Sequence, residues 1–136
     1  MLTYQTVSLD DARRIIDAGI AKAEEIDSPS NIAVVDTGGN LVAHVRMDGS
    51  QLGSIEHSID KARTSMFFRK PTGDLAEDSR PGGPLWGIAL SGYGTVIVFA
   101  GGLPLSVDGR IVGAIGVSGG TGEEDTVIAR AAVARL

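Results

Sequence analysis

The sequence of 136 residues has no cysteine, few aromatic residues and no excess of basic residues. Without a thiol, the chain cannot form a disulfide, a zinc–thiolate site, an iron–sulfur cluster or a cysteine nucleophile. Aromatic residues make up only 4% of the chain, so the core must be built from valine, isoleucine, leucine and alanine. The formal net charge of −5 argues against nonspecific nucleic-acid binding, which relies on excess lysine and arginine to neutralise phosphates.

Long apolar runs are also missing. None reaches the ~20 residues that a membrane-spanning helix needs, and the N-terminal residues lack the basic region and apolar stretch of a signal peptide. The length and the 43% of hydrophobic residues suit a single domain over residues 1–136. We therefore expect a cytoplasmic protein that has neither a membrane nor a nucleic acid as a partner.

Capping residues mark the first and last helices. Ser8 and Asp11 have the spacing of a capping box, and small or apolar residues follow at helical intervals as far as Ile26. Thr121 and Glu124 have the same spacing before a final helix that runs to the end of the chain. The three acidic residues that begin this helix satisfy its dipole and would repel a phosphate, so we expect capping and solvation there rather than anion or metal binding.

Glycine-rich turns organise the strands into hairpins. Thr37–Asn40 and Asp108-Gly109 supply the positive φ angles that tight hairpins require, and aliphatic residues alternate around them, with Ile111 and Ile115 expected on one face. Because hairpin-linked strands are antiparallel, we predict an α/β (α+β) sandwich in which helices cover one face of a five-stranded antiparallel sheet. The expected strands lie within residues 31–36, 41–47, 96–102, 103–107 and 110–118.

A second amphipathic helix is predicted over about Ser54 to Arg69. At about 100° per residue its apolar side chains cluster on one side, while a phenylalanine falls on the opposite side. A helix packed on one side only has little reason to carry that phenylalanine, so we expect the outer face to meet another subunit or a ligand. The apolar stripe consists of Ile55, Ile59, Ala62 and Met66, and the outer face of His57, Lys61, Thr64 and Phe68.

Residues 71–94 form a long irregular segment with three prolines and six glycines. We expect a short helical turn near Asp74–Ser79 and a loop that carries Trp86, the only tryptophan of the chain. Loops of this length in small domains are usually functional. A turn stiffened by proline could present Trp86 to a flat ligand, with arginines nearby to hold carboxylates; alternatively, Trp86 fills the core or a subunit boundary.

Four stretches of the chain resemble one known family. The segments VVDTGGNLVAHVRMDG, GSIEHSIDKARTSMFF, PGGPLWGI and GGLPLSVDGRIVGAIGVSGGTGEED are similar to the GlcG/HbpS family, also called the haem-degrading domain family, and the likeness extends from Ser8 to Ala134. It implies a profilin-like or PAS-like sandwich that assembles into homo-oligomers, from dimers to octamers. It also implies haem or a related tetrapyrrole as the candidate cofactor. A haem-binding member uses a histidine on the first helix, whereas this chain has none between Ser8 and Ile26.

The candidate ligand-binding residues come from the sheet edge, the second helix and the tryptophan loop. The two histidines are the candidate axial ligands of haem iron, and the arginines are suited to pairing with carboxylates. Each has a plainer interpretation, because a polar sheet face, a surface histidine and a packed tryptophan are ordinary features of small domains. The candidates are His44, Arg46, His57, Lys61, Arg63 and Trp86, with His44 and His57 also as metal ligands.

Three functions remain open from the sequence. The first is a small-molecule-binding homo-oligomer whose ligand is haem or another tetrapyrrole. The second is an enzyme or accessory subunit acting on a small hydroxy acid or aldehyde, with His57 or His44 as general base. The third is a structural subunit of an oligomer. Local spacing identifies no nucleophile–base pair and no histidine-based metal motif, so no catalytic residue is assigned.

Overall fold

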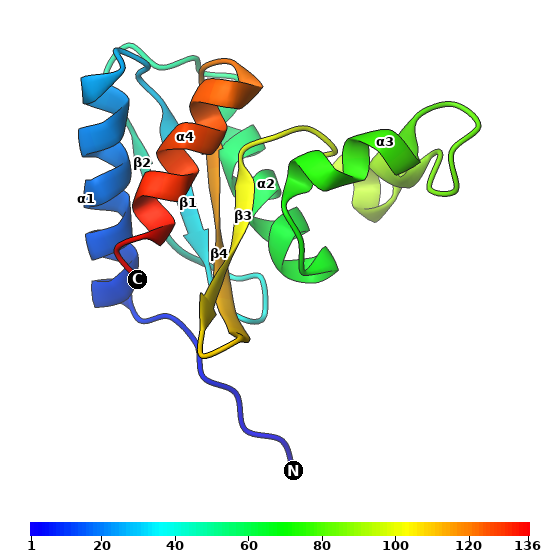
Figure 1. Cartoon of the computed structure of the whole chain (residues 1–136), viewed down its shortest axis with the longest axis horizontal. Helices are drawn as coiled ribbons and strands as arrows, with labels where there is room; N and C mark the ends of the chain where they lie inside the picture. Colours follow the sequence, from blue (N-terminus) through cyan, green and yellow to red (C-terminus); the bar gives the residue numbers. More distant parts are fainter.

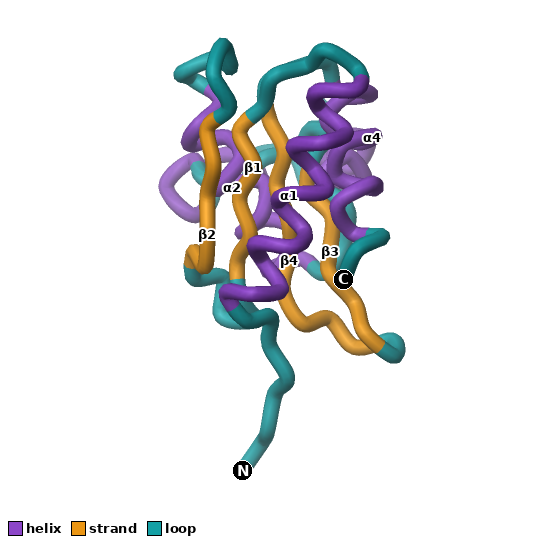
Figure 2. Tube along the Cα trace, turned by 90° about the vertical axis from the view of Figure 1, so that its left-hand side faces the viewer, coloured by secondary structure: helices purple, strands orange, loops and turns teal.

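The computed structural model describes all residues from Met1 to Leu136. Its elements are α1 (Leu9–Glu25), β1 (Asn31–Val35), β2 (Leu41–Arg46), α2 (Ser54–Phe68), α3 (Leu75–Ser79), β3 (Gly102–Val107), β4 (Arg110–Ser118) and α4 (Gly122–Val133). The strands form one antiparallel sheet in the order β2-β1-β4-β3. Helices α1 and α4 cover one face of the sheet and α2 covers the other, as Figure 1 and Figure 2 show. None of the helices combines the length and the apolar character that crossing a bilayer requires.

The predicted capping boxes and hairpin turns are confirmed. Ser8 and Asp11 cap α1 reciprocally, each side chain accepting a hydrogen bond from the other residue's backbone N–H, and Thr121 and Glu124 cap α4 in the same way. Hydrogen bonds lower the pKa of Asp11 to about 2, and the one from the Ser8 backbone N–H has the largest effect. In the β3–β4 turn, Asp108-Gly109 adopts left-handed φ angles of 49° and 75°. Contacts between residues close in sequence therefore form as their spacing predicts.

The sheet has four strands rather than the five expected, because residues 96–101 do not form a strand. Only the last residue of this segment bonds to the sheet backbone, where the Gly101 carbonyl oxygen accepts a hydrogen bond from Val117 N–H at 2.9 Å. Side-chain hydroxyls hold the ends of the segment. The Ile97 N–H donates to Thr64 Oγ1 at 3.0 Å, and the next strand begins where Gly102 N–H donates to Thr72 Oγ1 at 2.9 Å.

Helices cover both faces of the sheet, not one face as expected, and the core is therefore double. Every residue of β1 is buried, and the four residues after Asn31 are all apolar, which is typical of a strand covered on both sides. The larger cluster, against α1 and α4, includes Ile15, Ile32, Val34, Ile115 and Val117. The smaller cluster, against α2, consists of Ala33, Val35, Ala62, Met66 and Ala114.

A β-bulge changes one of the predicted faces of β4. The register of the β3–β4 ladder shifts between Leu105 and Ser106. An extra residue in one strand turns the side chains beyond it to the other face. Val112 consequently packs with Ile115 in the larger cluster, whereas Ile111 packs against the smaller one. The expectation that Ile111 and Ile115 share a face is wrong for this reason.

The face of α2 that meets the sheet differs from the predicted apolar stripe. Lys61 and Thr64, expected on the outer face, are buried, while Ile55 and Ile59 are only half-buried. The sheet offers backbone rather than side chains at this contact, because β4 carries Gly116 there. A Cβ on that glycine would collide with the Ser58 carbonyl oxygen of α2. Small and polar residues on the helix can therefore lie directly against the strand.

The chain between α2 and β3 extends away from the sandwich, as Figure 1 shows at the right-hand side. The expected helical turn is confirmed as α3, and short 3-10 turns follow at Ile88–Leu90 and Gly92–Gly94. We call residues 80–95 the projecting segment. Trp86, Leu90 and Tyr93 face solvent in the single chain, and none of the segment's residues belongs to a core cluster.

Gly116→Ala should destabilise the fold, because the new Cβ would collide with the Ser58 carbonyl oxygen. We expect the free energy of unfolding to fall by about 3 kcal/mol, the upper end of the usual cost of overpacking. Urea titration followed by circular dichroism measures the change. Gly53→Ala is the matched control, because no atom lies within 4 Å of a Cβ at Gly53, and it should change stability by less than about 0.5 kcal/mol. Equal stability of the two variants would refute the close α2–β4 contact.

Candidate functional site

Lys61 is the most enclosed of the candidate residues, with 1% of its surface exposed. Its Nζ donates to Asp125 Oδ2 at 3.0 Å and to the Val117 carbonyl oxygen at 2.8 Å, and it lies 5.1 Å from the centroid of the Phe99 ring. Burial lowers the pKa of Lys61, and the Asp125 carboxylate opposes that shift. Since its charge is paired inside the protein, Lys61 links α2 to α4 and the sheet and does not face solvent.

The partner of Lys61 belongs to the acidic run that begins α4. Asp125 is buried, and its Oδ1 accepts a hydrogen bond from Gly120 N–H at 3.0 Å. Solvation and capping were expected for the whole run. Glu123 is exposed and Glu124 caps the helix, as expected, but Asp125 is neither solvated nor a cap. No group of three or more side chains in the structure is arranged to hold a metal ion.

His57 lies on the exposed side of α2, next to Phe99 from the segment before β3. The two rings meet edge to face, with centroids 5.7 Å apart and an interplanar angle of 81°. The imidazole forms no hydrogen bond or ion pair within the chain. Phe99 is 48% exposed. This arrangement of His57 and Phe99, which we call the His57 surface, presents an imidazole beside an aromatic ring.

His44 is half-buried on β2. It pairs with Ala33 in the β1–β2 ladder, on the sheet face that α2 covers. Burial lowers the pKa of His44, and Glu56 on α2 opposes that shift, so the neutral imidazole is favoured at pH 7. Its Nε2 is buried and has no hydrogen-bond partner. A ligand arriving from solvent cannot reach Nε2 without movement of the surrounding chain.

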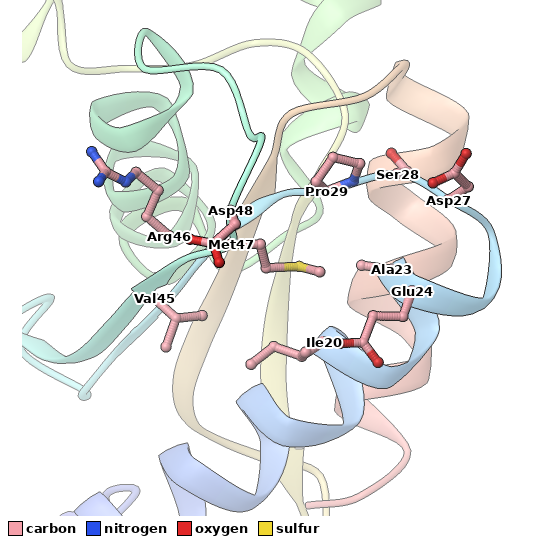
Figure 3. Close-up of a pocket in the computed structure, with 10 residues that line it drawn as sticks. All are labelled: Ile20, Ala23, Glu24, Asp27, Ser28, Pro29, Val45, Arg46, Met47 and Asp48. Atoms are coloured by element: carbon pink, nitrogen blue, oxygen red, sulfur yellow. The ribbon is translucent and has the colours of Figure 1, made fainter.

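The remaining candidates point in separate directions. Arg46, at the end of β2, lines a groove of about 560 Å³ beside α1, but Figure 3 shows its side chain directed away from Glu24. Arg63 Nε donates to the Gly39 carbonyl oxygen at 3.2 Å and so ties α2 to the β1–β2 turn. Trp86 is 70% exposed on the projecting segment, so it does not fill the core of this chain. The structure therefore does not gather the six candidates into one site.

Sequence patterns do not identify Phe99 or Asp125 as site residues. Lys61 and Asp125 are 64 positions apart, so no motif spacing connects them. The helical wheel gives no signal for the pair either, because it puts Lys61 opposite the apolar stripe of its helix. Phe99 lies in a segment predicted as a strand, and its meeting with His57 depends on that segment leaving the sheet.

The fold and much of the sequence are shared with known proteins. A family model described as "Haem degrading protein HbpS-like" matches residues 7–134. The chain is 38% identical over 128 residues to an uncharacterized 15.0 kDa protein of the dhaT-dhaS intergenic region of Citrobacter freundii, covering 94% of this chain and 90% of that protein.

Two solved structures show the same architecture over nearly the full length of both chains. Protein ORFY of Klebsiella pneumoniae superposes with a TM-score of 0.97 at 34% identity, covering 98% of this chain and 92% of that one. A PduOC:heme complex superposes with a TM-score of 0.93 at 31% identity, covering 96% of this chain and 95% of that one.

Removing either partner of the Lys61–Asp125 pair should destabilise the protein, because the remaining charge is buried without a counter-charge. We expect Lys61→Met and Asp125→Asn each to lower the free energy of unfolding by about 3–5 kcal/mol, measured by urea titration. The double variant should lose less than the sum of the single losses.

Lys22→Met is the matched control for this pair. It removes one partner of the exposed Lys22–Glu25 bridge, and such surface pairs contribute less than about 1 kcal/mol. If Lys61→Met were no more harmful than Lys22→Met, the buried pair would not hold α2 to α4.

Proposed function

Because the chain belongs to the HbpS-like family of haem-degrading proteins, we propose that it is a homo-oligomeric haem-binding protein whose iron ligand is His57. The observation that carries the proposal is the exposed imidazole of the His57 surface. The chain has two histidines, and Nε2 of the other, His44, is buried. A relative of the same fold, PduOC, has been crystallised as a complex with heme.

The surroundings of His57 suit a haem group. A histidine nitrogen is a common axial ligand of haem iron, and exposed aromatic side chains offer an apolar surface to a flat macrocycle. Phe99 supplies that surface beside His57. Bound haem would supply an iron centre able to bind small ligands or change oxidation state. His57 would hold the iron, and Phe99 would exclude water beside it.

Homo-oligomerisation is supported by the projecting segment. Trp86 and Leu90 are 70% and 83% exposed, and Tyr93 is fully exposed. Large apolar side chains gathered on one arm of a small protein are typical of surfaces that another protein covers. A second copy of the chain is the partner that the family resemblance implies. In this proposal the projecting segment of one copy packs against its neighbour.

Titration with hemin should produce a saturable shift of the Soret band that is lost in His57→Ala, because that variant lacks the exposed imidazole. His44→Ala is the matched control and should retain the shift, since Nε2 of His44 is buried. Urea titration checks that both variants are folded. Loss of the shift in His44→Ala alone would assign the iron to His44. No shift in the unaltered protein would refute haem binding.

The combined substitution of Trp86→Ser and Leu90→Ser should lower the molar mass measured by size-exclusion chromatography with light scattering. The physical reason is that serine removes the apolar area that contact with a second copy would bury. Leu52→Ser, which alters an exposed leucine outside the projecting segment, should leave the mass unchanged. An unaltered protein that elutes as a monomer would contradict the proposed assembly.

A further inference from the structure

A hollow of about 560 Å³ lies where the two hairpin turns, the end of α2 and the N-terminal residues come together. In Figure 1 these segments meet at the lower end of the sandwich, away from the first turn of α4. The His57 surface lies near the other end of α2, so the two are separate. Residues that line the hollow include Tyr4, Thr37, Met66, Arg69, Arg110 and Ile111.

The charge of this hollow is opposite to that of the protein. Arg69 and Arg110 line it and no acidic residue does, although the chain has 17 aspartates and glutamates against 12 lysines and arginines. Neither arginine takes part in any of the ion pairs of the structure. Asp36, beside the hollow in sequence, already accepts hydrogen bonds from Gly38 N–H and Asn40 N–H. Two guanidinium groups without a counter-charge favour an oxyanion ligand.

Both arginines extend from fixed points of the backbone. Arg69 ends α2 in the left-handed conformation, with φ 56° and ψ 41°, and its N–H donates to the Ser65 carbonyl oxygen. Arg110 is the first residue of β4, directly after the tight turn. The N-terminal side of the hollow is anchored by the Val7 N–H, which donates to the Val112 carbonyl oxygen at 2.9 Å. The backbone that carries these side chains is therefore positioned before a ligand binds.

Apolar surface distinguishes the kind of oxyanion that the hollow suits. Met66 is buried and Ile111 half-buried along its wall, and the hydroxyl groups of Tyr4 and Thr37 are available as hydrogen-bond donors. The volume lies in the range of small-molecule sites. We infer that the hollow binds a small organic acid, with Arg69 and Arg110 pairing to its carboxylate groups and the apolar wall contacting its carbon skeleton.

Isothermal titration calorimetry with succinate, glycolate and inorganic phosphate, at constant ionic strength, tests this inference. We expect saturable binding of at least one of the two organic acids and weaker binding of phosphate. Arg69→Asn, chosen because asparagine tolerates the left-handed conformation, and Arg110→Gln should each weaken acid binding at least about tenfold, the loss of one charge-assisted pair. Arg13→Gln, an exposed arginine on α1 outside the hollow, is the matched control and should bind as the unaltered protein does.

The outcomes separate this inference from the haem proposal. Arg69→Asn and Arg110→Gln should keep the hemin response, because the hollow and the His57 surface lie at different ends of α2. No saturable binding of either acid, equal or tighter binding of phosphate, or unchanged binding by both arginine variants would each overturn the inference. Unchanged urea midpoints of the variants show that a lost affinity reflects the hollow and not unfolding.

Discussion

The close contact between α2 and the sheet is the constraint on which the rest of the structure depends. Gly116 has no side chain where α2 crosses β4, so the helix and strand backbones meet directly. Gly101 gives similar room to Lys61, since a Cβ there would lie 2.7 Å from Lys61 Nζ. The lysine can then reach Asp125 in the first turn of α4. A helix on one face of the sheet is thus joined by buried charge to a helix of the opposite layer.

This contact also explains three glycines of the C-terminal third, Gly101, Gly102 and Gly116. Gly102 on β3 and Gly116 on β4 lie against α2. A Cβ at Gly116 would collide with the Ser58 carbonyl oxygen, and a Cβ at Gly102 would lie 2.6 Å from the Lys61 carbonyl oxygen. Glycine serves here to let two backbones approach, and not to provide a flexible tether. The first turn of α4, beside the last glycines, is satisfied by Thr121 and Glu124, so the helix end has its own cap.

Sequence patterns predicted the parts of the fold whose contacts are local. The Ser8–Asp11 capping box and the Asp108-Gly109 turn involve residues that are close in the chain, and their geometry follows from residue type alone. The fifth strand and the buried face of α2 depended on distant partners. Whether Ile97 joins a sheet is decided by Thr64, 33 residues away. Whether Lys61 is buried is decided by a carboxylate on another helix, which a helical wheel cannot include.

The candidate site was predictable to the same extent. The helical wheel correctly predicted that His57 and Phe68 are exposed, but it put Lys61 and Thr64 on the same face, and both of these are buried. It could not show that Phe99 would stand beside His57, since the segment that carries Phe99 leaves the sheet. Nor could it bring Arg69 close to Arg110, which follow different elements and meet only when α2 ends near the β3–β4 turn. Both candidate ligand surfaces are thus built on α2, one near its start and one at its end, and the glycine contact with β4 that positions this helix also positions them.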